Sequence, residues 1–183
     1  MRNTAIGMTE FKTVSAGITA LDAMVKAAEV NIIEAQTVCP GKYIAIIDGD
    51  LSSVKAAIDI AESQYSVQLI SSFILGNPHE GIFSAIYGTT HIEKIGALGI
   101  LETYDGASVI VAADTAAKTA VVDIIEIRIA KGMCGKSYML ITGTVAAVEA
   151  AVEKAKHTVA ERGMYLDASM IANPDKKMYP SIL

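Results

Sequence analysis

Two short segments of the sequence place a cysteine beside a glycine and a lysine. The first reads Cys39-Pro40-Gly41-Lys42 and the second reads Met133-Cys134-Gly135-Lys136. A cysteine thiolate can bind a metal, but metal clusters are normally held by four thiolates, so one chain with two cysteines offers too few. A Gly-Lys pair also occurs in phosphate-binding loops. The first segment lacks both the earlier glycine and the Ser or Thr after Lys42 that this motif requires.

The remaining polar residues do not form a recognisable catalytic set. The three histidines, His79, His91 and His157, have no cysteine or carboxylate partner at the spacing of metal ligands. Histidines of this kind are mostly exposed or lie at the ends of elements. The paired serines at 52–53 and 71–72 lie beside no evident base and in no nucleophile-elbow motif. We therefore predict no catalytic residues and no enzymatic activity.

The composition narrows the class of partner. The chain has 183 residues, a formal net charge of −5 and a pI of about 5.2, with no basic stripe, which argues against a nucleic-acid binder. Its longest uncharged stretch, residues 63–78, is too short and too polar to span a membrane, and the N-terminus lacks the apolar region of a signal peptide. Two cysteines do not suggest a disulfide framework, so a reducing, cytoplasmic setting is expected.

The sequence contains an internal repeat. Residues 5–38 align with residues 97–130 at 12 of 34 identical positions, and the alignment continues after small gaps at the turns. The chain therefore contains two copies of one unit, which we place at residues 1–92 and 93–183. Apolar residues make up 52% of the chain and the mean hydropathy is +0.41. Small domains with this much apolar surface are expected to form oligomers.

Each copy alternates between strand and helix patterns. In the first copy we predict strands at 5–11, 31–38, 42–48 and 67–75, with a Pro-Gly turn between the second and third. Apolar residues at helical spacing predict helices between the first two strands and after Asp50, which is a suitable N-cap, and a short helix follows at 79–87. The predicted stripes are Val14, Ile18, Leu21, Val25 and Ala28, then Val54, Ile58, Ala61 and Tyr65.

This order of elements predicts the fold class. The order β-α-β-β-α-β plus a short C-terminal helix predicts an α+β, ferredoxin-like domain: a four-stranded antiparallel sheet with helices packed on one face. In a ring-shaped oligomer, the hairpin tips at 39–41 and 133–135 can meet on the symmetry axis and line a hole. The alternative is that each tip is an ordinary hairpin exposed to solvent.

Several segments resemble the signature stretches of bacterial microcompartment (BMC) shell proteins. The resemblance covers nearly the whole chain, and the second copy repeats part of it in register. Two copies per chain resemble the tandem-domain class of this family, and the segment around Cys39 is most similar to tandem members from propanediol-utilisation microcompartments. The matching segments are 5–10, 22–28 and 47–54 in the first copy, and 97–102 and 143–148 in the second.

The resemblance implies a trimer shaped like a pseudo-hexagonal tile, which packs beside other shell proteins and encloses a set of enzymes, with encapsulated redox enzymes as further partners. It also implies that Cys39 is the ligand of an iron–sulfur cluster, of the 4Fe–4S type, with one cluster on each three-fold axis. Lys26 and Lys118 would lie at the tile edges. The pore rim would consist of Pro40, Gly41, Lys42, Met133, Cys134, Gly135 and Lys136.

One feature of the family is not evident, and alternatives to the cluster remain. The tile-edge arginine often found near the Asn-Pro turn is replaced by His79 in the first copy and Asp175 in the second. Cys39 could instead be a small apolar residue at the end of a strand. The pore could then conduct metabolites without a cluster. The chain could also be a ferredoxin-like regulatory trimer with effectors between its subunits, or an enzyme that uses the open iron of a cluster.

Overall fold

The computed structural model describes residues 5–92 and 94–182, except for the side chain of residue 181. The chain divides into two compact units, Met1–Pro78 and His79–Leu183, and each is described by itself. The repeat had suggested a division after residue 92, beside Glu93, which lies outside the described residues. Among the described helices, none is long and apolar enough to cross a membrane.

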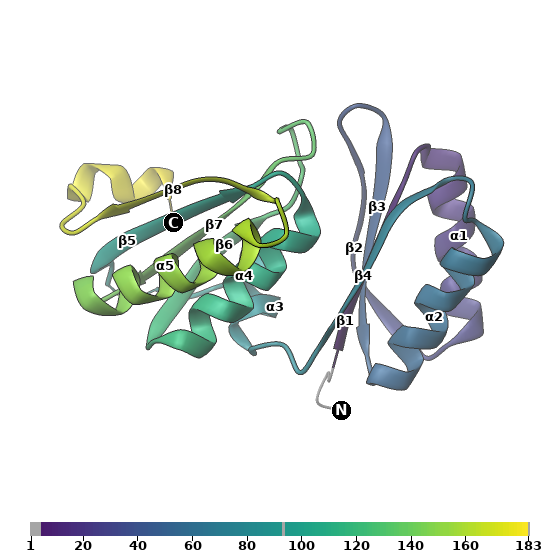
Figure 1. Ribbon diagram of the computed structural model, residues 1–183, viewed down its shortest axis with the longest axis horizontal. Helices are drawn as coiled ribbons and strands as arrows, with labels where there is room; N and C mark the ends of the chain where they lie inside the picture. The colour runs from purple at the N-terminus through teal and green to yellow at the C-terminus, as the bar shows by residue number, and fades with distance from the viewer. Residues whose placement is uncertain (1–4, 93, 183) are drawn as a thin grey trace. The chain divides into compact units, whose positions relative to one another are not determined.

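The first unit is an antiparallel four-stranded sheet with two helices on one face (Figure 1). The strand order is β2-β3-β1-β4, with β1 in the centre beside β3 and β4, which is the order of a ferredoxin-like domain. The elements in chain order are β1 (Ala5–Phe11), α1 (Val14–Ala27), β2 (Val30–Val38), β3 (Lys42–Gly49), α2 (Leu51–Gln64) and β4 (Leu69–Gly76).

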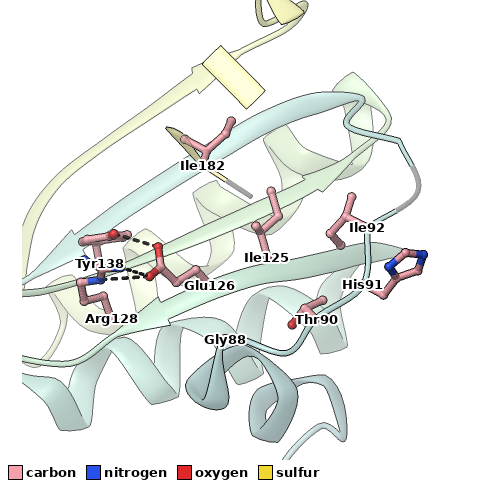
Figure 2. Close-up of a pocket in the computed structure, with 9 residues that line it drawn as sticks. All are labelled: Gly88, Thr90, His91, Ile92, Ile125, Glu126, Arg128, Tyr138 and Ile182. Atoms are coloured by element: carbon pink, nitrogen blue, oxygen red, sulfur yellow. Dashed lines mark hydrogen bonds and ion pairs between the residues drawn. The ribbon is translucent and has the colours of Figure 1, made fainter. Parts of the chain in front are cut away.

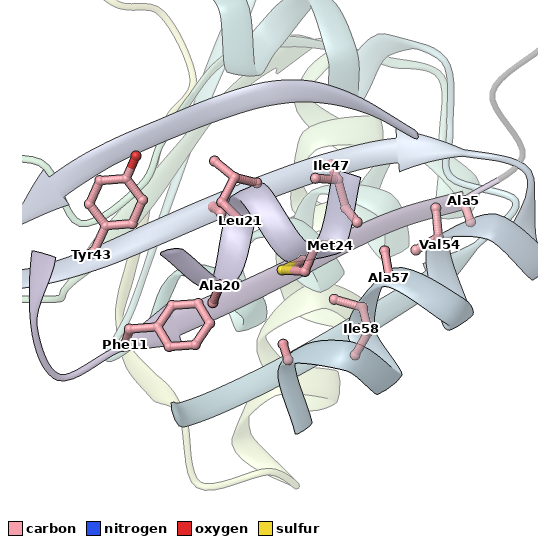
Figure 3. Close-up of a cluster of buried hydrophobic side chains, with 12 residues drawn as sticks. Ala5, Phe11, Ala20, Leu21, Met24, Tyr43, Ile47, Val54, Ala57 and Ile58 are labelled. Carbon is pink, nitrogen blue, oxygen red and sulfur yellow. The ribbon is translucent and has the colours of Figure 1, made fainter. Parts of the chain in front are cut away.

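The core of the first unit lies between the sheet and its two helices. Alternate residues of β1 and β3 point at α1 and α2, because successive side chains of a strand face opposite sides of the sheet. Figure 3 shows these side chains meeting those of the two helices. The cluster comprises Ala5, Phe11, Ala20, Leu21, Met24, Tyr43, Ala45, Ile47, Val54, Ala57, Ile58 and Ala61.

The second unit repeats this arrangement. Its strand order is β6-β7-β5-β8, and α4 and α5 cover one face of the sheet (Figure 1). The predicted α+β fold, with two tandem four-stranded sheets, is therefore confirmed. The elements are α3 (Gly81–Tyr87), β5 (Ala97–Thr103), α4 (Gly106–Thr119), β6 (Val122–Arg128), β7 (Ser137–Gly143), α5 (Val145–Ala160), β8 (Tyr165–Ile171) and a final 3₁₀ helix, Lys176–Ser181.

The short helix α3 belongs to the second unit, although it follows the last strand of the first copy. It packs against β6 and α4, and its side chain Ile82 is fully buried. The backbone N–H of His79, just before α3, donates to Asp114 Oδ1 on α4 at 2.8 Å. The segment 79–92 is therefore attached to the second sheet.

Some predicted details differ from the structure. Helical spacing predicts that Ile18 is buried, but it is 53% exposed, and α1 packs through Gly17, Ala20, Leu21 and Met24. The stripe of α2 is Val54, Ala57, Ile58 and Ala61. Asp50 does occupy the N-cap of α2, but its side chain makes no capping hydrogen bond. The last strand of the first copy begins at Leu69, two residues later than predicted.

Candidate functional site

The first hairpin tip (Cys39, Pro40 and Gly41) joins β2 to β3. Val38 pairs with Lys42, so three residues make the turn. All three are exposed, and the Cys39–Pro40 peptide bond is cis. Gly41 has a φ of +77°, which side chains disfavour, while a Cβ there would meet no atom within 4 Å. Glycine is needed for backbone conformation, and the space around the tip is open in the isolated chain.

An ion pair fixes the base of this hairpin. Lys42 Nζ lies 2.9 Å from Glu10 Oε1, and the side chains are 29% and 12% exposed. The other oxygen of Glu10 accepts a hydrogen bond from Ser71 Oγ at 3.4 Å. The ammonium group of Lys42 is thus held over the neighbouring strand β1, below the tip.

The second hairpin tip (residues 129–136) joins β6 to β7 and is longer. Four of its residues have a positive φ: Ala130, Gly132, Cys134 and Gly135, with φ of 54°, 72°, 54° and 90°. In the first tip, only Gly41 has a positive φ. The hydroxyl of Ser137 accepts from the N–H of Ala130 at 3.0 Å and closes the loop at its base. Because two residues are inserted here, Cys39 has no single counterpart in the second unit.

Both cysteines are exposed free thiols. Cys39 directly follows the last residue of β2, at the end of a strand, and its side chain is not buried within this chain. Within residues 5–92 and 94–182, no three His, Cys, Asp or Glu side chains lie close enough together to hold a metal ion. A metal or cluster at Cys39 would need ligands from other chains.

The two lysines predicted at tile edges lie in the last turns of α1 and α4 and form ion pairs at matching positions. Lys26 Nζ lies 2.6 Å from Asp22, as the spacing predicted, and Lys118 Nζ lies 2.7 Å from Asp114. The Lys26 side chain is 73% exposed, and that of Lys118 is 42% exposed. Both side chains can reach solvent.

A polar network in the second unit was not found from the sequence. Tyr138 on β7 donates to Glu126 Oε2 on β6 at 2.8 Å, and Arg128 donates from Nε to Glu126 Oε1 at 2.9 Å (Figure 2). The Arg128 guanidinium also lies 5.8 Å from the centre of the Tyr138 ring. Burial, and then the hydrogen bond to Glu126, raise the pKa of Tyr138 to about 12. The sequence signal that could have indicated this network is the pair of opposite charges, Glu126 and Arg128, two residues apart on the predicted strand.

This network borders a cavity of about 510 Å³ on the face of the second sheet away from α4 and α5. The segment after α3 forms one wall, the strands form the floor, and Ile182 lies on the far side (Figure 2). The lining residues are Gly88, Thr90, His91, Ile92, Ile125, Glu126, Arg128, Tyr138 and Ile182.

Comparisons with known proteins identify the repeated domain. The family model described as "BMC domain" matches twice, at residues 5–78 and 97–174. The bacterial microcompartment shell protein PduT of Citrobacter freundii is 37% identical over 175 residues, covering 96% of this chain and 95% of that protein. The carboxysome assembly protein CcmO of Synechococcus elongatus is 28% identical over 91% of this chain and 64% of its own length.

A solved structure extends this relationship to three dimensions. The crystal structure of a microcompartment protein from Desulfitobacterium hafniense DCB matches with a TM-score of 0.93 and 44% identity, covering 96% of this chain and 98% of that one. The chain belongs to the BMC domain family and contains two tandem BMC domains.

Proposed function

We propose that the protein is a structural shell protein of a bacterial microcompartment. The observation that carries this proposal is the 37% identity to the shell protein PduT across nearly the full length of both chains. The carboxysome protein CcmO is similar across most of this chain. The protein would accordingly be located in the shell of a microcompartment, beside other shell proteins, and it would have no catalytic role of its own.

The proposed assembly is a homotrimer. Six BMC domains from three two-domain chains make a plate with pseudo-six-fold shape, which can tile beside hexamers. Closed rings require a head-to-tail interface that repeats around the axis, and a duplicated domain provides two similar surfaces for it. Lys26 and Lys118 would contact neighbouring tiles, because each is exposed at the end of a helix.

The two hairpin tips would line the central pore. Three short tips, each with Cys39, Pro40 and Gly41, would alternate with three longer tips that contain Met133, Cys134, Gly135 and Lys136. Because the tips differ in length and sequence, the pore would have three-fold chemistry. Lys42 is held by Glu10 beneath its tip, so the backbone and thiol of the tip are its most accessible groups.

Three Cys39 thiolates would bind an iron–sulfur cluster on the axis. Cys39 fits this role because its thiol is exposed at the start of a three-residue turn with open space around Gly41. Three protein ligands satisfy three irons of a 4Fe–4S cluster, and the fourth iron keeps a site without a thiolate. When bound, such a group supplies one-electron transfer across the shell. The chain's own residues hold the thiol at the rim and set its access to solvent.

Assembly tests the shell function. Purified protein should sediment at three times the 19.2 kDa chain mass and form flat sheets or tubes on concentration, seen by negative-stain electron microscopy. Lys26→Ala with Lys118→Ala should keep the trimer and reduce sheet formation. Discrete trimers that never form sheets, and that bind a small effector saturably, would favour the ferredoxin-like regulatory protein instead.

Anaerobic purification tests the cluster. The wild-type protein should contain iron and acid-labile sulfide and should show broad visible absorption. Cys39→Ser should abolish all three and leave the trimer intact, whereas the matched variant Cys134→Ser, on the other tip, should keep them. If the wild-type protein stays colourless after reconstitution under reducing conditions, the cluster proposal is wrong. The alternative, a pore that conducts metabolites without a cluster, would then be favoured.

A further inference from the structure

We propose that the α1–β2 edge of the first unit, which carries Ile18 and Ile32, binds the final 3₁₀ helix of a second copy of this chain. Met178 of that helix would pack on the two isoleucines. The proposal rests on the proposed trimer and names the surfaces that close it, because a head-to-tail contact that repeats around a three-fold axis gives a closed ring. It does not involve the hairpin tips.

Identical isoleucines on the edge strands of the two sheets differ in exposure. Ile32 on β2 and Ile124 on β6 occupy the same position of the repeat and pair with Ile47 and Ile141. Ile47 belongs to the core beneath the helices, so Ile32 points to the helix side of its sheet. Ile32 is 47% exposed, whereas Ile124 is 3% exposed. Because the two strands are paired alike, the difference comes from what covers them.

The helices beside these strands differ in the same way. Ile18 on α1 corresponds to Ile110 on α4, and Ile18 is 53% exposed whereas Ile110 is fully buried. Ile110 lies four residues before Asp114, so the two side chains share one flank of α4. Asp114 accepts the N–H of His79 just before α3. The flank of α4 that carries Ile110 therefore faces the segment that contains α3.

Helix α3 is the cover in the second unit. It packs against β6 and α4 (Figure 1). A Cβ on Gly81 would lie 3.7 Å from Cδ1 of Ile124, and Ile82 is fully buried. The described part of the first unit, residues 5–78, has only α1 and α2 as helices. The α1–β2 edge is therefore left open in that unit.

The chain carries a counterpart of α3 near its C-terminus. The turn Asn173-Pro174 corresponds to Asn77-Pro78, which precedes α3, so Met178 takes the position of Ile82. Met178 lies in the final 3₁₀ helix and is 40% exposed, whereas Ile82 is fully buried. Both sides of the contact made by α3 thus have apolar counterparts that are exposed in the single chain.

A second copy of the chain brings these exposed counterparts together. In sequence, α3 follows the last strand of the first copy and covers the domain that comes next. The final 3₁₀ helix follows the last strand of the second copy, so the next domain around the ring is the first unit of another chain. Association would remove Ile18, Ile32 and Met178 from water together. Methionine is unbranched and flexible, so it can fit the surface between two isoleucines.

Paired charge substitutions test the contact in solution. Wild type, Ile32→Lys, Met178→Glu and the double variant are compared by sedimentation equilibrium over a range of protein concentrations. Each single variant should raise the concentration at which trimers dissociate by at least about tenfold, because it places a charge in an apolar contact. The double variant should recover most of this loss, since its two charges would pair. Val67→Lys, in the exposed turn before β4, should not weaken the trimer and should not rescue Met178→Glu.

Cross-linking identifies the partner. In a Cys39→Ser, Cys134→Ser background, the double variant Ile32→Cys with Met178→Cys is treated with a bismaleimide of short spacer. Denaturing gels should show covalent dimers and trimers, and either new cysteine alone should leave the chains mainly unlinked. A link formed within one chain would overturn the assignment to a second copy.

The two proposals can fail separately. If the wild type is monomeric at every concentration, the proposed trimer is wrong and this interface is wrong with it. If the wild type is trimeric, but the single charge variants dissociate at the wild-type concentration and the cysteine pair gives no link between chains, only this interface is overturned. Circular dichroism checks that the charge variants are folded, as the exposure of Ile32 and Met178 in the single chain predicts.

Discussion

The ring of Tyr43 lies directly over Gly17, so close that a Cβ on residue 17 would overlap it. This contact joins α1 to β3 at the base of the first hairpin. The repeat places Val109 and Ser137 at the corresponding positions of the second unit, and both are buried. A small residue on the helix faces a large one on the strand in one unit, and the sizes are reversed in the other.

Gly17→Val should therefore destabilise the protein. Inserting a side chain into a packed core costs about 1–3 kcal/mol, which outweighs the better helix propensity of most residues relative to glycine. The double variant Gly17→Val with Tyr43→Ser reproduces the second unit and should recover part of the loss. The wild type, the two single variants Gly17→Val and Tyr43→Ser, and the double variant form a double-mutant cycle. Urea unfolding of these four proteins at one fixed protein concentration gives the coupling free energy between the two positions. If the effects of the two substitutions on the free energy of unfolding are strictly additive, the contact between residues 17 and 43 does not determine how α1 packs on β3.

The ion pair between Lys42 and Glu10 should contribute more to stability than the pair between Lys26 and Asp22. The Glu10 side chain is 12% exposed, so Lys42→Met would leave a mostly buried carboxylate without its cation, at a cost of about 1–3 kcal/mol. Lys26→Met removes a pair whose side chains are 73% and 57% exposed, and it should cost less than about 0.5 kcal/mol. Thermal unfolding compares the stability of the two variants. Equal losses of stability would contradict the prediction that the Lys42–Glu10 pair contributes more than the Lys26–Asp22 pair.

Much of the fold could be predicted from the sequence because the local patterns are strong. The strands predicted at 31–38 and 42–48, and the turn between them, agree closely with β2 and β3, since β-branched runs and Pro-Gly punctuation are local signals. The buried face of α1 was wrong at Ile18 for a non-local reason. Gly17 carries no apolar side chain, yet it faces the core because Tyr43, distant in sequence, fills the space above it.

One candidate site could be predicted from local sequence patterns, and the other could not. The hairpin that carries Cys39 could be predicted because its Pro-Gly turn and flanking strands are local patterns, whereas the role of Cys39 as a cluster ligand follows only from the family resemblance. The cavity bordered by Thr90, Tyr138 and Ile182 could not, because these residues lie in segments far apart in the chain. The attachment of α3 to the second sheet was also missed, because it depends on contacts with β6 that come later in the sequence.

Tyr138 should ionise well above the ordinary pH of a tyrosine. Its pKa is raised from 10 to about 12, so the folded protein holds this proton more tightly than the unfolded chain does. The resulting stabilisation is complete below pH 10 and is lost as the pH rises through about 12. The difference in ultraviolet absorbance between wild type and Tyr138→Phe should show no tyrosinate from this residue at pH 10. Glu126→Gln removes the charged acceptor and should lower the pKa, whereas an unchanged titration would assign the shift to burial alone.

Asp114 and Asp22 occupy the same position of the repeat but should differ in their importance. Both form an ion pair with a lysine four residues later, yet Asp114 is 7% exposed and also accepts the N–H of His79 before α3. Asp114→Ala would leave that N–H and Lys118 without this acceptor, at a cost of about 1.5–3 kcal/mol for a charged hydrogen bond. Asp22→Ala should cost less than about 0.5 kcal/mol, because its pair is exposed. Hydrogen exchange should locate the difference: Asp114→Ala should speed exchange in α3, where Asp22→Ala should leave it unchanged. Equal exchange in α3 for the two variants would mean that the apolar contacts of Ile82 with its surroundings are enough to hold this helix on the second unit.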